Sequence, residues 1–297
     1  MRPAEKGFLL LSCSMGDPQR KILTTAQLRT LARRMRSMPL SVQQRELALE
    51  DITSLGYDKA FAQRILHLLS QDDLLTHYLR RAEKMGCVGI TRISDQYPLI
   101  LRRKLGEDAP ACLWTKGDRS LLNMPAVSLV GSRDLRPDNC RFAEEAGRQA
   151  ARQGYVLISG NARGADRTAQ DACLNAGGKV ISVVADSLAE HSVEENQLLI
   201  SEHGFDEEFS AARALSRNRL IHAMGQITIV AQCTYGKGGT WDGTTKNLRF
   251  GWSPVFCYSD GSDAAEHLIQ MGAQPVATSG LQMLEKLQAT RICFFDQ

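Results

Sequence analysis

Predominantly apolar segments that alternate with helix-forming segments after Pro125 are the feature that most constrains how this chain of 297 residues can fold. The apolar segments are AVSLV (126–130), YVLIS (155–159), KVISVVA (179–185), QITIVA (226–231) and PVFCY (254–258). The helical stretches lie around 139–152, at 165–176, near 211–225, and at 242–250 and 262–272. Strands without polar alternation, separated by helices, are typical of a parallel sheet covered on both faces. The sequence therefore predicts an α/β fold with a Rossmann-like doubly wound parallel sheet, whose ligands bind beyond the carboxyl ends of the strands.

A different pattern precedes this region. Residues 20–85 carry apolar side chains at helical spacing and almost no glycine, which predicts three or four short helices. The following stretch contains Pro98, Pro110 and short apolar pieces, as expected of a connector that packs on the next domain. We therefore predict three parts: a small all-helical domain over 1–85, a connector over 86–124, and a Rossmann-like domain over 125–297 that ends in a helix at 279–288 and an apolar tail.

The composition is that of an ordinary globular protein, with 43% hydrophobic and 23% charged residues. No apolar run approaches the roughly 20 residues of a membrane-spanning helix, so we predict no membrane association and a cytoplasmic location. The eight cysteines are scattered without a C-x-x-C pair, and the six histidines show no metal-ligand spacing. This pattern indicates reduced core thiols, and we predict no metal site and no cofactor.

Positive charge is concentrated in the N-terminal part of the chain. The net charge is only +3, yet the first 124 residues carry 20 lysines and arginines against 13 acidic residues. Arg29, Arg33 and Arg36 follow one another at helical spacing, so they would share one face of a helix. A basic face is typical of proteins that bind a phosphate backbone, and we predict a secondary DNA track there. The alternative is that these arginines pair with acids elsewhere, such as Asp72–Asp73 or the acidic cluster 206–208.

Glycines and cations lie beside the ends of the predicted strands. Gly131-Ser132-Arg133 follows the first strand, and Ser159-Gly160-Asn161-Ala162-Arg163-Gly164 follows the second. Arg217-Asn218-Arg219 precedes the QITIVA strand, and TYGKGGTWDGT (234–244), which contains Lys237, follows it. Loops that follow parallel strands open on the same edge of a sheet, so Arg133, Arg163 and Lys237 should converge on one crevice. Exposed glycine N–H groups, helix N-termini and arginine forks all suit phosphate, so the sequence predicts an anion site.

Several chemical signatures are absent from the sequence. It contains neither a G-x-x-x-x-G-K-[ST] loop nor a G-x-G-x-x-G loop after a strand. Ser159 has no neighbouring histidine in the sequence, and Asp166 has an ordinary alternative role in the first turn of a helix. We therefore predict no catalytic residues and no enzymatic activity, with the bound phosphates belonging to a polymer. For each loop alone, a solvated turn is the alternative.

Five segments carry a family resemblance: VSLVGSR (127–133), ISGNARGADRTAQDACLNAGGKVISVV (158–184), LLISE (198–202), SRNRLIHAMG (216–225) and LIQMGA (268–273). In this order they resemble the motifs of the DNA-processing protein A family (DprA/Smf), and the N-terminal helices are similar to its small SAM-like domain. The resemblance covers roughly residues 50–275. It implies a single-stranded DNA-binding protein of DNA processing and recombination. It also implies loading of a RecA-type recombinase in natural transformation, and a homodimer formed through the Rossmann domain.

The loops and the resemblance together imply a set of binding residues. They are Gly131, Ser132, Arg133, Ser159, Gly160, Arg163, Gly164, Asp166, Arg217, Asn218, Arg219, Lys237, Gly238, Gly239 and Thr240. Tyr235 and Trp241 flank Lys237 and are candidates for base stacking, with core packing as the alternative for Trp241.

A second interpretation of the same crevice stays open. The glycine loop GKGGTWDGTTKN (236–247) is similar to the GG-x-GT nucleotide loops of the wider SLOG superfamily, to which the DprA/Smf family belongs. That likeness implies a nucleotide-binding sensor or a hydrolase of a nucleotide derivative. A groove that continues as a basic track would favour DNA, whereas a closed cavity with a polar, base-reading wall would favour a nucleotide.

Overall fold

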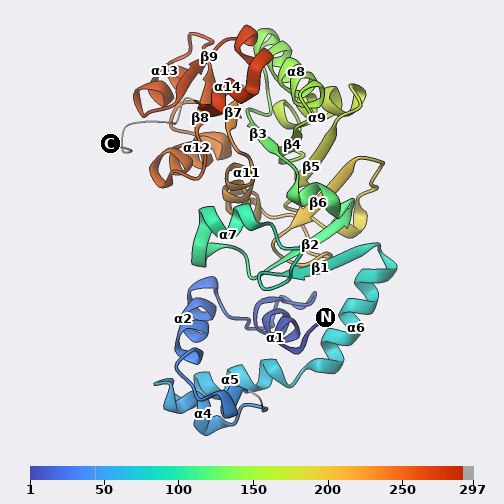
Figure 1. The fold of residues 1–297 in the computed structure, drawn as a ribbon, viewed down its shortest axis with the longest axis vertical. Helices are drawn as coiled ribbons and strands as arrows, with labels where there is room; N and C mark the ends of the chain where they lie inside the picture. Colours follow the sequence, from blue (N-terminus) through green and yellow to red (C-terminus); the bar gives the residue numbers. More distant parts are fainter. Residues whose placement is uncertain (44, 290–297) are drawn as a thin grey trace.

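Within residues 1–43 and 45–289, which the computed structural model describes, nine strands form one sheet in the order β1-β2-β6-β5-β4-β3-β7-β8-β9 (Figure 1). Their bounds are β1 (Cys87–Thr91), β2 (Cys112–Gly117), β3 (Ala126–Val130), β4 (Val156–Ser159), β5 (Lys179–Val183), β6 (Gln197–Ser201), β7 (Thr228–Val230), β8 (Val255–Tyr258) and β9 (Gln274–Val276). Strands β3 to β9 pair in parallel, which confirms the predicted doubly wound sheet. The winding direction reverses between β3 and β7, where such folds place their ligand crevice.

The predicted connector 86–124 is joined to this sheet by strand pairing. It supplies β1 and β2, which are antiparallel to each other, and β2 is also antiparallel to β6. Between and after them lie α7 (Leu99–Leu105), η1 (Gly106–Asp108) and η2 (Arg119–Asn123). The sequence did not predict these strands, because their apolar pieces are short and stand beside prolines. The boundaries of the three predicted domains stay predictions.

Helices cover both faces of the sheet, because successive strand residues point to opposite sides. Leu129 of β3 packs in the core with Phe142 of α8 and Ala169 of α9 on one face. Val130 packs in a second core with Ile221 of α11 on the other face. The helices of this part of the chain are α8 (Pro137–Arg152), α9 (Ala165–Asn175), α10 (Ala211–Ser216), α11 (Asn218–Met224), α12 (Gly238–Phe250), α13 (Asp263–Gln270) and α14 (Leu284–Ala289), with 3-10 turns η3 (Leu188–Glu190) and η4 (Thr278–Met283).

Three predicted elements differ in detail. The helix expected near 211–225 is two helices, α10 and α11, which meet at Arg217. The helix expected at 242–250 begins earlier, at Gly238, and the one expected at 279–288 is a 3-10 turn followed by α14. The motif LLISE forms β6, a strand that the sequence analysis did not assign. The predicted apolar tail lies outside the described residues.

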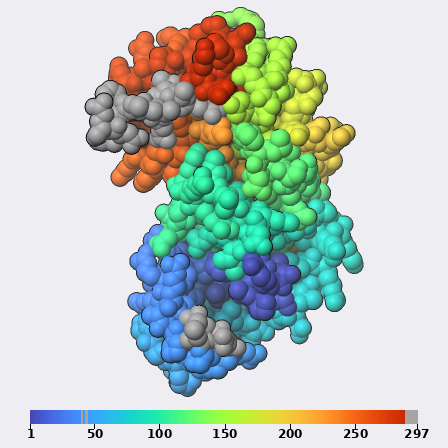
Figure 2. All heavy atoms as spheres, in the orientation of Figure 1, coloured from blue at the N-terminus to red at the C-terminus, as the bar shows by residue number. Residues whose placement is uncertain are grey.

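The N-terminal region is helical, as predicted, and forms one end of an elongated molecule (blue to cyan in Figures 1 and 2). Its helices are α1 (Pro3–Ser12), α2 (Thr25–Met35), α3 (Leu40–Gln43), α4 (Leu49–Ser54), α5 (Lys59–Leu69) and α6 (Asp72–Lys84). Thr24 starts α2, since its hydroxyl oxygen accepts the Gln27 N–H at 3.2 Å. Tyr78 of α6 packs edge-on against Trp114 of β2 at 5.2 Å between ring centroids, which fixes the helical end to the sheet.

In the part of the chain that the structure describes, no helix is long and apolar enough to cross a membrane. Seven of the eight cysteines lie in this part and all seven are free thiols. Six of them are buried and Cys140 is partly exposed. Burial raises the pKa of Cys13 to about 11 and that of Cys233 to about 12, as expected of unreactive core thiols.

Candidate functional site

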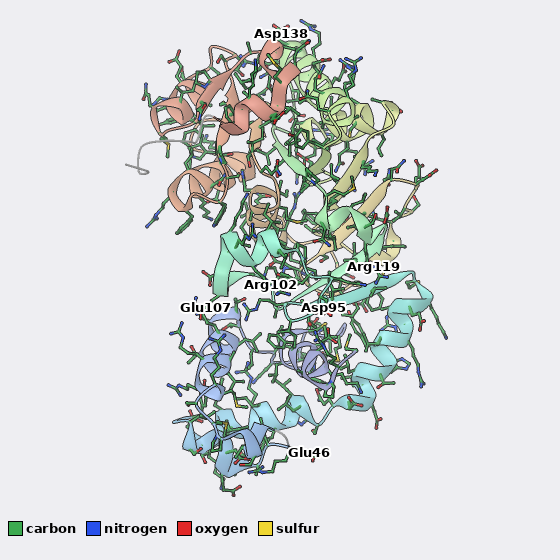
Figure 3. All side chains as sticks on the ribbon, viewed as in Figure 1. Glu46, Asp95, Arg102, Glu107, Arg119 and Asp138 are labelled. Carbon is green, nitrogen blue, oxygen red and sulfur yellow. The ribbon has the colours of Figure 1, made fainter. Side chains whose placement is uncertain are left out.

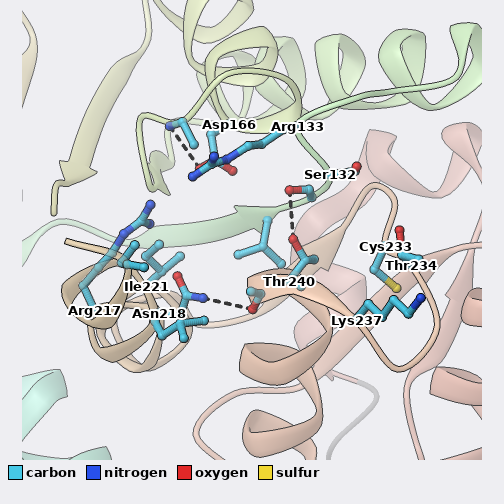
Figure 4. Close-up of a pocket in the computed structure, with 18 of the residues that line it drawn as sticks. Ser132, Arg133, Asp166, Arg217, Asn218, Ile221, Cys233, Thr234, Lys237 and Thr240 are labelled. Atoms are coloured by element: carbon cyan, nitrogen blue, oxygen red, sulfur yellow. Dashed lines mark hydrogen bonds between the residues drawn. The ribbon is translucent and has the colours of Figure 1, made fainter. Parts of the chain in front are cut away.

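Two adjoining cavities lie beyond the carboxyl ends of the central strands, and together we call them the crevice. The larger, about 560 Å³, is lined by the loop after β3, the start of α12, and residues of α10 and α11 (Figure 4). The smaller, about 330 Å³, lies beside the loop after β4. Arg133, Phe209 and Arg217 line both cavities, so the two form one continuous site. Its position is the switch point between β3 and β7.

Hydrogen bonds hold the glycine loop of α12 against its neighbours (Figure 4). The Thr240 hydroxyl donates to the carbonyl oxygen of Gly131 at 2.9 Å, and Asn218 Nδ2 donates to the carbonyl oxygen of Gly239 at 2.9 Å. No side chain caps the start of α12 at Lys237. The first turn of α12, from Gly238 to Thr240, lines the larger cavity, where its N–H groups and the positive end of the helix dipole favour an anion.

The loop after β4 lies directly against the loop after β3. Gly164 has a φ of 86°, and a Cβ at this position would lie 2.4 Å from the carbonyl oxygens of Ser132 and Arg133. The Ala165 N–H donates to the Ser132 carbonyl oxygen at 3.0 Å and joins the two loops. Only glycine permits this approach, which accounts for the second glycine of the SGNARG segment (159–164).

Arg217 and Asp166 are two buried, oppositely charged side chains at the base of the crevice that influence each other without an ion-pair contact. Arg217 is 7% exposed, and its Nη2 donates to the carbonyl oxygen of Gly160 at 2.9 Å. Burial raises the pKa of Asp166, an effect that the Arg217 charge and the Ala162 N–H oppose. Burial also lowers the pKa of the Arg217 guanidinium, against the pull of Asp166. Arg217 is therefore part of the wall of the crevice and is not an exposed cation within it.

The predicted cations differ in how far they are neutralised. Arg133 and Lys237 are exposed, line the larger cavity, and have no ion-pair partner among the described residues. Arg163 lines the smaller cavity, is 76% exposed, and pairs with Asp134 at 2.6 Å. The three predicted loops thus surround one crevice, but only two of their cations are uncompensated.

Three residues of the predicted binding set line neither cavity of the crevice, namely Ser159, Gly164 and Arg219. Arg219 points away from the crevice, pairs with Glu202, and donates to the carbonyl oxygen of Asp108 at 2.8 Å. Its position after Asn218 on a helix turns its side chain to another face, which the sequence alone did not show. Ser159 is buried in β4, and its hydroxyl donates to the carbonyl oxygen of Leu129 at 2.7 Å. Ser159 therefore supports the sheet.

His222 is a site residue that the sequence analysis missed. It is fully buried, lines the larger cavity, and burial lowers its pKa to about 3, so it is neutral. The Asn247 amide oxygen accepts the Ser253 N–H at 2.9 Å, which leaves Asn247 Nδ2 to donate to His222 Nδ1 at 3.2 Å. The proton of the neutral ring therefore lies on Nε2. In the described structure that Nε2 has no partner.

Phe209 is the aromatic side chain that the structure brings to the crevice. It is 57% exposed and lines both cavities. The predicted candidates, Tyr235 and Trp241, line neither; their rings meet edge-on at 5.0 Å, and Trp241 packs against the core. The packing alternative therefore applies to Trp241. A lone phenylalanine between acidic residues and α10 gave no pattern from which its role could be predicted.

The basic face of α2 meets acids that were not among the expected partners. Arg29 pairs with Asp108 at 2.8 Å and Arg33 pairs with Glu107 at 2.5 Å. Arg36 is exposed and has no partner in the described part of the chain. The acids proposed as alternatives pair elsewhere, for instance Asp72 with Lys6 and Asp206 with Arg81.

Residues 1–43 and 45–289 contain no group of three histidine, cysteine or acidic side chains that could hold a metal.

The chain is similar in sequence to known proteins of one family. The family model described as DNA recombination-mediator protein A matches residues 89–288. DNA processing protein DprA of Streptococcus pneumoniae is 30% identical over 256 residues, which cover 82% of this chain and 88% of the relative. DprA of Bacillus subtilis is 29% identical over 170 residues, which cover 53% of this chain and 56% of that protein.

Solved structures agree with the sequence relatives. The X-ray structure of DNA processing protein A from S. pneumoniae has a TM-score of 0.73 at 28% identity, over 96% of this chain and 98% of that one. The same protein from Helicobacter pylori has a TM-score of 0.57 at 25% identity, over 67% of this chain and 96% of that one. Because the family model spans well over half of the sequence and the pneumococcal relative aligns over most of its length, this chain belongs to the DNA recombination-mediator protein A family.

Proposed function

We propose that this protein binds single-stranded DNA in the crevice. The observation that carries the proposal is the pair Arg133 and Lys237, two exposed cations with no ion-pair partner within residues 1–43 and 45–289, which line the same cavity as the start of α12. Such a site favours phosphate groups. The proposal agrees with the H. pylori relative, whose structure is described by its single-stranded DNA binding mode.

Phe209 supports a single strand over a duplex. Its exposed ring stands at the junction of the two cavities, beside the cations that would hold the backbone. Stacking on an aromatic ring needs a base that is not already stacked and paired within a duplex. A duplex would offer this crevice only its phosphates, so the single strand gains an interaction that the duplex lacks.

The wider role follows from the family. We propose that the protein acts as a homodimer in DNA recombination, delivers the bound strand to a RecA-type recombinase, and catalyses no reaction itself. Membership of a recombination-mediator family supports this role. The test is recombinase filament assembly on strands coated with single-strand binding protein, with and without this protein, and a mass measurement in solution.

Binding itself is tested by fluorescence anisotropy with labelled oligothymidylate, with unlabelled duplex as competitor and with rising salt. We expect affinity to fall steeply with salt, because each neutralised phosphate releases counterions. Arg133→Ala should weaken binding, whereas Arg141→Ala, which removes an exposed arginine of α8, should not. Equal competition by duplex, or salt-independent binding, would contradict the proposal.

One observation favours a second candidate, a pocket for a free nucleotide. His222 carries a neutral N–H donor at a buried position that lines the larger cavity, and such a donor suits a base carbonyl better than a phosphate. Nucleoside monophosphates and diphosphates should therefore be included as competitors. Displacement of oligothymidylate by micromolar nucleotide would favour the nucleotide sensor or hydrolase over the DNA-binding protein.

A further inference from the structure

A separate cavity of about 460 Å³ lies between α2 and the segment 92–107, away from the crevice. Its lining includes the arginines Arg29, Arg33, Arg36, Arg92 and Arg102, and Glu107 is the acid among the lining residues. We call it the arginine cavity. The sequence analysis found the three arginines of α2 but not the other two, which come from the predicted connector. In Figure 3, Glu107 lies between α2 and α7, and Arg102 lies on α7.

Two of these arginines are held in place without being neutralised. Arg92 Nη1 donates to the carbonyl oxygens of Glu107 at 2.8 Å and Ala109 at 3.2 Å. Arg102 Nη2 donates to the carbonyl oxygen of Ser94 at 2.9 Å. Carbonyl oxygens orient a guanidinium but leave its full charge. In the described residues the Nε of Arg102 is buried and has no partner.

The carboxylates nearby compensate only part of the charge. Asp108 pairs with Arg29, and Glu107 pairs with Arg33. Arg36, Arg92 and Arg102 have no carboxylate within ion-pair distance in the part of the chain that the structure describes. Like charges held close together repel one another, and an anion in the cavity would remove that repulsion. The arginine cavity therefore has an uncompensated positive charge that is already oriented.

Asp108 connects the arginine cavity to the crevice. Its carboxylate pairs with Arg29 of α2, and its carbonyl oxygen accepts from Arg219 of α11 at 2.8 Å. Arg219 directly follows Asn218, which lines the larger cavity of the crevice. Asp108 therefore stands between Arg29 of the arginine cavity and Arg219, the residue that follows Asn218 of the crevice.

We infer that the arginine cavity binds backbone phosphates of the same nucleic-acid strand that occupies the crevice. The inference rests on the proposed function, because it needs a strand there. Several guanidinium groups from two separate segments suit a chain of phosphates more than a single one, since each fork can take its own pair of oxygens. The N-terminal helical part then contributes affinity for long strands and none for short ones.

Substitution of Arg36 tests the inference without breaking a contact inside the protein, because Arg36 is exposed and has no partner among the described residues. Arg36→Glu is compared in the full chain with Arg80→Glu, which changes an exposed arginine of α6 that also has no partner among the described residues. Affinities for oligothymidylates of about five and about thirty nucleotides are measured by anisotropy against salt. Arg36→Lys, which keeps the charge, serves as the rescue variant, and circular dichroism checks the fold of each variant.

We expect Arg36→Glu to weaken binding of the long strand about fivefold and to reduce its salt slope by about 0.7, the value of one phosphate contact on a single strand. Short-strand binding should not change, and Arg36→Lys and Arg80→Glu should resemble the wild type. Equal effects of Arg36→Glu and Arg80→Glu on the long strand would overturn the inference. Binding of inorganic tripolyphosphate that is lost in Arg36→Glu, with long-strand affinity unchanged, would also overturn it in favour of a free-phosphate site.

The same measurements distinguish failure of the proposed function from failure of the arginine cavity. If the wild type binds neither oligonucleotide, the crevice is not a DNA site and the proposed function fails. If the short strand binds and Arg133→Ala abolishes it, while the long strand binds no more tightly than the short one, only the arginine cavity is excluded.

Discussion

The Arg217 guanidinium occupies the space in which any residue other than glycine at position 160 would place its Cβ. A Cβ there would lie 1.7 Å from Arg217 Nη1, and Arg217 Nη2 already donates to the Gly160 carbonyl oxygen at 2.9 Å. Gly160 and Arg217 are 57 positions apart in the sequence and belong to different motifs. The glycine after β4 is therefore required by an arginine that meets it only in the folded protein.

Gly160→Ala should displace Arg217 and disorganise the crevice wall. We expect a loss of about 1–3 kcal/mol in the free energy of unfolding, as for other overpacked buried sites, together with weaker binding of single-stranded DNA. Gly7→Ala in α1 is the matched control, since the nearest atom to its added Cβ is 4.0 Å away and alanine favours a helix. Thermal or urea unfolding measures the effect, and a Gly160→Ala variant as stable as Gly7→Ala would contradict the packing argument.

The buried neutral His222 should make stability depend on pH. Its pKa is lowered to about 3 in the folded protein, against roughly 6.5 when unfolded, so the unfolded state binds its proton first as the pH falls. The contribution of the neutral His222 ring to the free energy of unfolding is fully present above about pH 6.5 and is progressively lost between about pH 6.5 and 3. At pH 5 the loss is about 2 kcal/mol.

The measurement compares urea unfolding of the wild type and of His222→Ala at several pH values. The variant is expected to be less stable at neutral pH because it leaves a cavity, but its free energy of unfolding should fall less steeply between pH 7 and 5. Parallel pH profiles for the two proteins would show that the pKa of His222 is the same in the folded and the unfolded protein.

Phe209 should contribute to binding through base stacking. Phe209→Ala should weaken binding of single-stranded DNA by about 1–3 kcal/mol and leave the melting temperature nearly unchanged, because the ring is more than half exposed. Phe250→Ala is the control, since that ring is equally exposed but lies at the far end of α12, stacked on Trp252. Anisotropy with oligothymidylate distinguishes them, and equal losses in the two variants would exclude Phe209 from the site.

Alanine substitutions of Arg133 and Arg163 should weaken DNA binding to different extents. Arg133→Ala removes an uncompensated cation and should weaken DNA binding by about 1–3 kcal/mol. Arg163→Ala should cost less than about 1 kcal/mol, because a phosphate must compete with the Asp134 carboxylate 2.6 Å away. Asp134→Asn should strengthen DNA binding, whereas Arg163→Ala weakens it, because the substitution removes the carboxylate that competes with phosphate. Weaker binding by Asp134→Asn would show that this ion pair positions Arg163 for DNA.

No turnover of a nucleotide derivative is expected from the crevice. Asp166 is buried beside Arg217, and Asp242 is paired with Lys246 at 2.8 Å, so neither carboxylate is placed as a free base. Chromatography of nucleoside monophosphates after incubation with the protein checks this. Hydrolysis that Asp166→Asn or Asp242→Asn abolishes would make the protein an enzyme.

The strands β3, β4, β5, β7 and β8, and with them the loops that open on one edge, were determined by the sequence alone, whereas β6 and β9 were not assigned. A buried parallel strand such as AVSLV needs apolar side chains on both faces, and this requirement is visible in five consecutive residues. The glycine loops around Arg133, Arg163 and Lys237 followed from the same pattern. The antiparallel strands β1 and β2 did not follow from it, because they belong to a stretch with Pro98 and Pro110 that resembles a connector.

Which cations stand free, and which polar groups are buried, was decided only by the tertiary structure. Arg29, Arg163 and Arg219 resemble Arg133 in the sequence, yet each meets a carboxylate, in the case of Arg29 one that is 79 positions away. Ion pairing depends on segments that approach one another in space, whereas a strand or helix depends on neighbours in the chain. For the same reason the sequence could place the phosphate loops at one edge but could not predict the neutral His222 ring, the exposed Phe209 or the arginine cavity.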